Sequence, residues 1–250
     1  SFGTDPERYH RTRPRYPAAF VRELVDELPG REVLDVGVGT GIVARQLQTA
    51  GCRVLGVDVD ERMAESARRR GFEVEVARFE TWDPAGRTFD AVVAGQTWQW
   101  VDPVAGTTKA AEVLRPGGRL AVFWNAGDPP PELAEAFAAV YRRLLPDLPE
   151  PFGVESAVDG YGRFLDTAED AIRQTTGFGE PEQRRYPWEQ TYTRDAWLDQ
   201  LPTSGFFAQI PPHTARAVVA GIGEAVDAAG GAFTMRYTTV VVAAERVPAP

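Results

Sequence analysis

The segment from Val33 to Gly41, Val-Leu-Asp-Val-Gly-Val-Gly-Thr-Gly, constrains this chain most, because an apolar run leads directly into three closely spaced glycines. The apolar run predicts a parallel strand buried on both faces. The glycines let the backbone turn sharply and approach a ligand closely. A second apolar run, 54–57, ends at Asp58, 23 residues after Asp35, where such folds bind a ribose diol. The pattern predicts a nucleotide-binding turn in a doubly wound α/β fold.

The glycine spacing argues against a dinucleotide ligand. The dinucleotide motif G-x-G-x-x-G offers the amides of a helix N-terminus to a pyrophosphate. Here the third glycine comes one residue early, Ile42 takes the sixth place, and Asp35 sets a carboxylate just before the loop. That carboxylate repels a pyrophosphate and attracts a cation. The alternative is that Asp35 only caps the following helix, although a buried acid without a partner is costly.

Composition limits the class of protein and its partners. A chain of 250 residues with 43% hydrophobic content can bury one substantial core, with room for an inserted subdomain. The net charge is -9, and the basic run 68–70 lies on an expected helix, where a solvated face is the simpler interpretation. Nucleic acid is therefore not an expected partner, because phosphate binding needs a positive surface.

Cysteine content and hydropathy exclude other classes. Cys52 is the single cysteine, which rules out an internal disulfide and a thiolate metal cluster, and we expect no metal site. No apolar run approaches the length of a membrane span, and no signal-peptide pattern opens the sequence. We therefore expect a soluble cytoplasmic protein, either monomer or homodimer, without a membrane partner.

Strand and helix patterns alternate along the first half of the chain, as a doubly wound sheet requires. There we expect strands at 33–36, 54–58, 72–77, 89–95 and 119–124, helices at 17–28, 40–50, 61–70 and 103–114, and a turn at 115–118. In the second half we expect helices at 132–145, 166–176, 194–201 and 211–229, strands at 182–191 and 232–246, and no clear periodicity from 146 to 162. Ligands then collect at the carboxyl ends of the strands.

The motif Asp-x-Gly-x-Gly-x-Gly resembles motif I of the class I S-adenosylmethionine-dependent methyltransferases. Residues 9–17, 89–103 and 114–120 extend the resemblance to the type 11 branch, which includes ubiquinone, menaquinone and trans-aconitate methyltransferases. The resemblance covers about residues 5 to 125. It implies a Rossmann-like sheet of seven strands in the order 3-2-1-4-5-7-6, with the last strand antiparallel and helical lid insertions. Gln99 stands where this branch often has histidine.

The same resemblance implies a division of the chain. Residues 1–30 would form a cofactor-covering segment and helix, and residues 31–125 the cofactor-binding core. Residues 126–250 would add the substrate-side helices, the lid and the closing strands of the same domain.

The resemblance implies S-adenosylmethionine as cofactor and S-adenosylhomocysteine as product. The glycines would lie under the methionine part, Asp35 would favour its ammonium, Asp58 would bind the ribose, and Arg13 would pair with the carboxylate. Val59 and Met63 would flank the adenine, and Phe79 and Glu80 would lie at its edge. The full set of implied cofactor residues is Tyr9, Arg13, Asp35, Gly37, Gly39, Gly41, Asp58, Val59, Met63, Phe79, Glu80 and Gln96. Two alternatives stay open, since Glu80 is equally well explained as a solvated loop residue and Met63 as ordinary core.

Aromatic residues between the sixth and seventh expected strands predict a lid with an apolar pocket, which suits a small aromatic or apolar acceptor. Trp197 and Phe206 are better explained as the core of that lid. The expected substrate residues are Trp98, Trp100, Asn125, Trp188, Tyr192 and Phe207. Candidates for removing a proton from the acceptor are His10, Tyr16, Gln99 through a water, and His213. Tyr16 is equally well explained as a hydrophobic staple, and His213 as a surface residue at a helix start.

The predicted activity is methyl transfer (EC 2.1.1) to O, N or C of a small molecule by in-line displacement, which depends on alignment and a dry site more than on a strong base. The first alternative is a protein that binds the cofactor without transferring methyl, either a pathway cyclase or a regulatory binder. A nicotinamide-dependent reductase is less favoured, because Ala105 stands four residues before Lys109, the sole lysine, where a tyrosine is expected. Low lysine with high alanine, arginine and proline suggests a GC-rich bacterial genome, from which we hypothesise a role in secondary metabolism.

Overall fold

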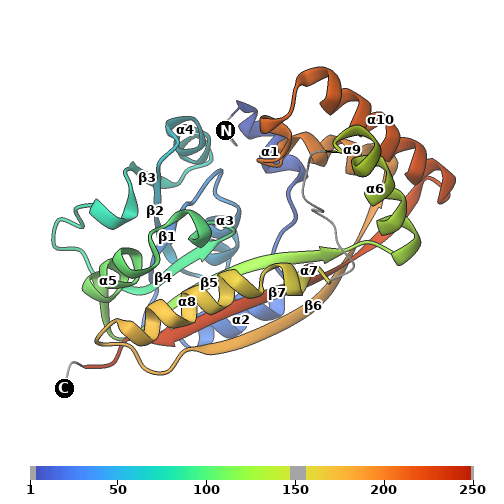
Figure 1. Cartoon of the computed structure of the whole chain (residues 1–250). Coiled ribbons are helices and arrows are strands. Elements are labelled where there is room, and N and C mark those ends of the chain that lie inside the picture. The colour runs from blue at the N-terminus through green and yellow to red at the C-terminus, as the bar shows by residue number, and fades with distance from the viewer. Residues whose placement is uncertain (1–3, 147–155, 249–250) are drawn as a thin grey trace. The chain divides into compact units, whose positions relative to one another are not determined.

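The computed structural model describes residues 4–146 and 156–248 and divides into two compact units (Figure 1). Unit 1 consists of Ser1–Pro14, Ala126–Gly160 and Pro187–Thr238. Unit 2 consists of Arg15–Asn125, Tyr161–Tyr186 and Thr239–Pro250. The segment expected to form the substrate side, 126–250, is thus shared between both units. The expected stretch without periodicity, 146–162, falls largely on 147–155, which lie outside the described residues.

Unit 2 is organised by a sheet of seven strands in the order β3-β2-β1-β4-β5-β7-β6. The pairs β3-β2, β2-β1, β1-β4 and β4-β5 are parallel, and β7 runs antiparallel to its neighbours (Figure 1). The strands are β1 (Glu32–Val36), β2 (Arg53–Asp58), β3 (Glu73–Val76), β4 (Phe89–Gly95), β5 (Leu114–Asp128), β6 (Glu182–Thr193) and β7 (Ala232–Glu245), of which the last three continue into unit 1. The predicted fold class, strand order and antiparallel closing strand are confirmed.

Helices cover both faces of this sheet, and Figure 1 shows α2 and α8 on opposite sides of β5 and β7. Capping side chains mark two helix starts, because Asp60 accepts from the Arg62 amide and Asp102 from the Ala105 amide. The helices of unit 2 are α2 (Ala18–Asp26), α3 (Ile42–Thr49), α4 (Glu61–Arg69), α5 (Pro103–Val113) and α8 (Gly162–Gln174), with the 3₁₀ turns η2 (Phe79–Thr81) and η3 (Trp98–Trp100).

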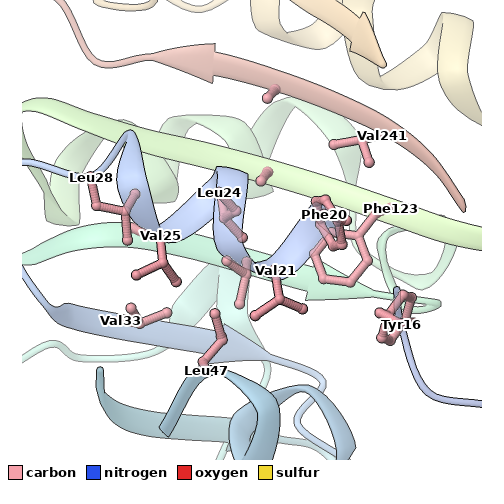
Figure 2. Packing of buried hydrophobic residues seen from close by; sticks show 14 of the residues in the cluster. Tyr16, Phe20, Val21, Leu24, Val25, Leu28, Val33, Leu47, Phe123 and Val241 are labelled. Carbon is pink, nitrogen blue, oxygen red and sulfur yellow. The ribbon is translucent and has the colours of Figure 1, made fainter. Parts of the chain in front are cut away.

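The core under α2 anchors the sheet in unit 2 (Figure 2). Phe20, Leu24 and Val25 lie on one face of α2 and pack against β1, β4 and β5. The rings of Phe20 and Phe123 lie 4.7 Å apart at an angle of 66°, an edge-on arrangement that aromatic quadrupoles favour. This packing holds the strands whose carboxyl ends carry the candidate site.

Unit 1 is mainly helical and has an aromatic core of its own. Its helices are α1 (Pro6–Thr12), α6 (Pro131–Leu144), α7 (Ala157–Gly160), α9 (Arg194–Gln200) and α10 (Pro212–Ala228), with the 3₁₀ turns η4 (Leu201–Thr203) and η5 (Phe207–Gln209). In the core, Phe137 stacks on Trp197 at 6.2 Å and meets Phe233 edge-on at 6.1 Å. Trp197 and Phe206 both pack into this cluster, as expected for residues of a core.

Two sequence expectations were wrong. The turn expected at 115–118 is part of β5, which begins at Leu114 and accommodates the glycines through a register shift against β4 near Phe89 and Ala91. Helix α1 was not expected, although Asp5 caps it through the Arg8 amide and Pro6 takes its first position. Both errors have the same cause. Pro and Gly were interpreted as breaks in secondary structure, since the sequence alone does not show their tertiary neighbours. Within the described residues, every helix is too short or too polar to cross a bilayer.

Candidate cofactor site

The loop after β1 has the left-handed backbone that its glycines predict. Gly37, Gly39 and Gly41 have φ angles of +67°, +56° and +85°, which side chains rarely tolerate. A Cβ at Gly37 would lie 2.2 Å from Thr97 Cγ2, and one at Gly41 would lie 2.6 Å from Phe72 Cε2. At Gly39 the nearest atom would be Met63 Cε, at 3.6 Å. The protein itself therefore requires the outer two glycines, while Gly39 leaves its backbone open to a ligand.

Asp58 connects this loop to the end of β2. Its Oδ2 accepts from the Gly39 amide at 2.7 Å and its Oδ1 from the Asp60 amide at 2.8 Å. Burial raises the pKa of Asp58, and hydrogen bonds from the backbone of Asp60, Gly39 and Val59 partly oppose the rise. A carboxylate has about four acceptor positions, so that these three donors leave one position open. Asp58 can therefore hold the loop and still accept from a hydroxyl group.

Asp35, in β1, is a buried acid whose two oxygens differ. The carboxyl accepts a hydrogen bond from the backbone of Ala44 in the first turn of α3, whereas Oδ2 has no hydrogen-bond partner within the described residues. The side chain is 1% exposed. Burial, and next the charge of Asp58, raise the pKa of Asp35 to about 8. Asp35 thus contacts the helix, as the capping alternative required, and still has an unused oxygen.

The residues expected around the adenine lie after β2 and β3. Val59 is 67% exposed, whereas Met63 and Phe79 are buried. Glu80 is largely buried, accepts from the Asp102 amide at 3.0 Å, and pairs with Arg78 at 3.5 Å. Glu80 is therefore not a solvated loop residue, since one of its oxygens fixes the start of α5. Binding of adenine by these residues stays a prediction.

A strained residue follows β4, next to the glycine loop. Gln96 has a φ of +57°, a left-handed conformation that costs free energy in residues other than glycine and is often found at functional sites. Its amide donates to the Phe123 carbonyl at 2.8 Å. The next residue, Thr97, directs Oγ1 to within 3.4 Å of the Gly37 carbonyl. Sequence reasoning missed Thr97, whose only signal was its place at the end of β4.

These features fit a nucleoside-bearing cation. A buried carboxyl with an oxygen unpaired within the described residues, an acid with a remaining acceptor position, and an uncovered glycine backbone lie on or just after the adjacent parallel strands β1 and β2. A ribose hydroxyl can donate to the open position on Asp58, and a cationic group can pair with the carboxyl of Asp35. A pyrophosphate fits poorly, because the negative charge of this pair of acids would repel it.

Comparison with known proteins shows which family this chain resembles. A family model described as a methyltransferase domain matches residues 33–118. An uncharacterized methyltransferase of Mycobacterium tuberculosis is 37% identical over 131 residues, which are 51% of this chain and 53% of that protein. Aklanonic acid methyltransferase DauC of Streptomyces is 29% identical over 197 residues, which are 72% of this chain and 89% of that enzyme. The chain thus spans about half the length of the mycobacterial relatives that it matches.

Solved structures extend the likeness beyond the matched domain. A proposed type II methyltransferase from Anaeromyxobacter dehalogenans superposes with a TM-score of 0.71 at 25% identity, over 94% of this chain and 99% of that one. The phosphoethanolamine N-methyltransferase 2 of Haemonchus contortus, in complex with S-adenosyl-L-methionine, shares the fold with a TM-score of 0.53 at 16% identity, over 98% of this chain and 57% of that one. The chain belongs to the class I S-adenosylmethionine-dependent methyltransferases.

Within this methyltransferase, three predicted substrate or catalytic residues of unit 2 are tied into the fold. Gln99 accepts from the indole of Trp124 at 2.8 Å and donates to the Gln96 carbonyl at 3.1 Å. Asn125 accepts from the Thr239 hydroxyl at 2.6 Å. Trp98 is buried near Phe79, with ring centroids 6.2 Å apart. Their catalytic and substrate roles stay predictions.

Tyr16 and Trp100 contrast with one another in exposure. Tyr16 is buried in the α2 core, and its hydroxyl would lie 2.7 Å from a Cβ built at Gly95. The position of the ring therefore fits the interpretation of Tyr16 as a hydrophobic staple. Its hydroxyl lies at the carboxyl end of β4. Trp100 is 67% exposed on η3. Its role as a substrate residue stays a prediction, as does catalysis by Tyr16.

The predicted cofactor and catalytic residues of the N-terminal segment lie on or just after α1 in unit 1. The Arg13 guanidinium donates to the Thr203 carbonyl at 2.8 Å and lies 5.0 Å from the centre of the Tyr9 ring. His10 is half-buried on α1. Pairing of Arg13 with the cofactor carboxylate stays a prediction, as do the roles of Tyr9 and His10.

The remaining aromatic candidates take part in the core of unit 1. Tyr192 and Tyr237 share a hydrogen bond of 2.9 Å, and Trp188 stacks on Tyr237 at 4.4 Å. Burial raises the pKa of the Tyr192 hydroxyl, which therefore stays protonated at neutral pH. Phe207 is 7% exposed in the same cluster, and His213 is exposed at the start of α10. Substrate contact by Trp188, Tyr192 and Phe207, and catalysis by His213, stay predictions.

Proposed function

We propose that this protein binds S-adenosylmethionine and transfers its methyl group to a small-molecule acceptor. One observation carries the proposal. The Gly39 amide of the glycine loop donates to Asp58 at 2.7 Å, and the neighbouring acid Asp35 has one oxygen without a partner among the described residues. When bound, the cofactor supplies a methyl group on a positively charged sulfur, which an acceptor displaces in line. The protein's contribution is to bind, orient and exclude water.

The residues divide this work by their chemistry. Asp58 would accept from a ribose hydroxyl, and the open backbone at Gly39 would lie against the amino-acid part. Asp35 would face the cationic group, directly or through water. Gln99, whose amide is used on both sides, would hold Trp124 and the strained Gln96 backbone rather than move a proton. Methyl transfer here is therefore proposed to rely on alignment, with no base required from Gln99.

For the acceptor, we propose a small aromatic or apolar molecule of bacterial secondary metabolism. The support is the likeness to aklanonic acid methyltransferase DauC, which extends over 89% of that enzyme. Exposed Trp100 in unit 2 offers an aromatic surface. Action on nucleic acid is not proposed, since the net charge is -9.

Label transfer tests the proposal. The protein is incubated with cofactor carrying a labelled methyl group, with aklanonic acid as the first acceptor and bacterial small-molecule extracts as the second. Enzyme-dependent label in a small-molecule product supports methyl transfer. Tight binding of S-adenosylhomocysteine without label transfer to any acceptor would favour the alternative of a cofactor-binding protein that does not methylate. Absence of binding by calorimetry would exclude both.

A further inference from the structure

Asp35 is buried in a way that an ionised carboxylate tolerates poorly. It is 1% exposed, and its Oδ2 has no hydrogen-bond partner in the part of the chain that the structure describes. A charged group taken out of water must gain a partner of opposite charge or become neutral. The hydrogen bond from the Ala44 backbone supports one side of the carboxyl and leaves the other unsupported.

Among the described residues, no positive charge contributes to the shifted pKa of Asp35. The charge that acts on it comes from Asp58 at the end of β2, which is negative. Its partners in the strand pairing, Gly56 on β2 and Val93 on β4, carry no charge. From α3 it meets the neutral Ala44 amide. Two neighbouring acids with no described cation between them repel each other when both are ionised. The pair therefore favours one bound proton and a total charge of -1, with the proton on the more deeply buried acid.

We propose that Asp35 is a neutral acid in the cofactor-free protein and loses its proton when the ammonium group of the cofactor arrives. This inference rests on the proposed function. The Asp35 O–H bond breaks, the proton passes to the buffer, and the resulting carboxylate pairs with the ammonium, so that charge and atoms balance. The site thereby selects a ligand by its cationic end as well as by its nucleoside.

The raised pKa of Asp35, about 8, gives the proposal a quantitative form. At pH 7 the acid is about 90% protonated, so that binding releases about 0.9 proton. Because the bound form carries one proton fewer, affinity rises with pH. From pH 6 to pH 7.5 the dissociation constant should fall about tenfold for each pH unit.

Calorimetry on the full chain tests this directly. S-adenosylhomocysteine is titrated at pH 7 in two buffers of different ionisation enthalpy, and the difference in heat gives the protons released. Methylthioadenosine, which has the nucleoside but no amino-acid part, is the matched ligand control. We expect about 0.9 proton with S-adenosylhomocysteine and none with methylthioadenosine.

The matched variant is Asp35→Asn, which keeps the size of the side chain but has no acidic proton. It should bind S-adenosylhomocysteine more weakly, release no proton, and show a dissociation constant independent of pH from 6 to 7.5. Proton release by this variant, equal release with methylthioadenosine, or binding to the unaltered protein without any release would each overturn the inference. If the variant does not fold, the two ligands on the unaltered protein still decide. Failure of S-adenosylhomocysteine to bind would instead refute the proposed function.

Discussion

The glycine loop of unit 2 and the aromatic core of unit 1 both contain residues that the sequence marks as functional, but they leave different atoms unpaired. In the loop region the unpaired atom belongs to an acid, Asp35. Within the described part of unit 1, the buried atoms without a hydrogen-bond partner are the neutral Trp197 indole nitrogen and Gln200 Oε1, together with Nε of Arg13, whose guanidinium donates to the Thr203 carbonyl through another nitrogen. A neutral group without a partner costs about 1–3 kcal/mol, whereas a buried acid must lose its charge or find a cation. A buried acid with an unpaired oxygen therefore indicates a ligand more strongly than clustered aromatic rings do.

The largest effect is expected when the aromatic core of unit 1 is disrupted, and it is an effect on stability. Phe137→Ala should lower the free energy of unfolding by about 3–5 kcal/mol, because Phe137 is buried between Trp197 and Phe233. Chemical denaturation followed by tryptophan fluorescence measures it. Phe137→Leu, which keeps most of the volume, should lose less than about 1.5 kcal/mol. A loss below 1 kcal/mol for the alanine variant would show that these rings are not a core.

The next effect concerns Asp58, the acid in the loop region that we propose binds the ribose. Asp58→Ala should weaken S-adenosylhomocysteine binding about 10- to 100-fold, since a hydrogen bond to a charged group contributes about 1.5–3 kcal/mol. Calorimetry measures the affinity, and thermal unfolding shows whether the loop amides of Gly39 and Asp60 tolerate the loss. Asp60→Ala removes the cap of α4 and the ion pair with Arg62 but keeps the backbone amide that bonds Asp58, so that it is the control and should bind normally. Equal affinities for the two variants would contradict the site.

A smaller effect separates backbone strain from ligand contact. Gly39→Ala should cost about 1–2 kcal/mol of stability, because its φ is +56°, and should weaken cofactor binding about tenfold by filling the open side of the loop. Gly51→Ala carries the same kind of strain, with a φ of +91° and nothing within 4 Å of the added methyl. It should lose similar stability and keep full affinity. A parallel fall in affinity for both variants would mean that strain alone is responsible.

The smallest effect on stability is expected at the exposed aromatic residue of unit 2. Trp100→Ala should change the free energy of unfolding by less than about 0.5 kcal/mol, because the side chain is 67% exposed. If Trp100 contacts the acceptor, KM for the acceptor rises several-fold while cofactor affinity is unchanged. Steady-state kinetics with the acceptor found by label transfer gives this value. An unchanged KM would remove Trp100 from the substrate residues.

Much of the fold was predictable because its signals are local. The strand order followed from the resemblance, and most helix and strand positions followed from apolar periodicity and glycine stops. The exceptions have a common cause. Residues 115–118 lie in β5 between its pairs with Phe89 and Ala91 of β4, and Gly117 and Gly118 exchange backbone hydrogen bonds with Arg246. A Pro-Gly-Gly sequence gives no sign of these partners. Aromatic residues were ambiguous for the same reason, since Tyr192 and Phe207 have the sequence signature of a binding pocket and lie in a core.

The sequence by itself determined the left-handed loop and the acid at the end of the second strand, and it led to the prediction of a cation rather than a pyrophosphate, because these depend on residue type and spacing along one short segment. Tertiary structure alone decided that Asp58 holds the Gly39 amide, that Thr97 closes on Gly37, and that one oxygen of Asp35 is left without a partner. Such facts depend on which strands pair and which side chains fill the space between them. Burial and pairing are properties of neighbours in space, and the order of residues along the chain does not contain them.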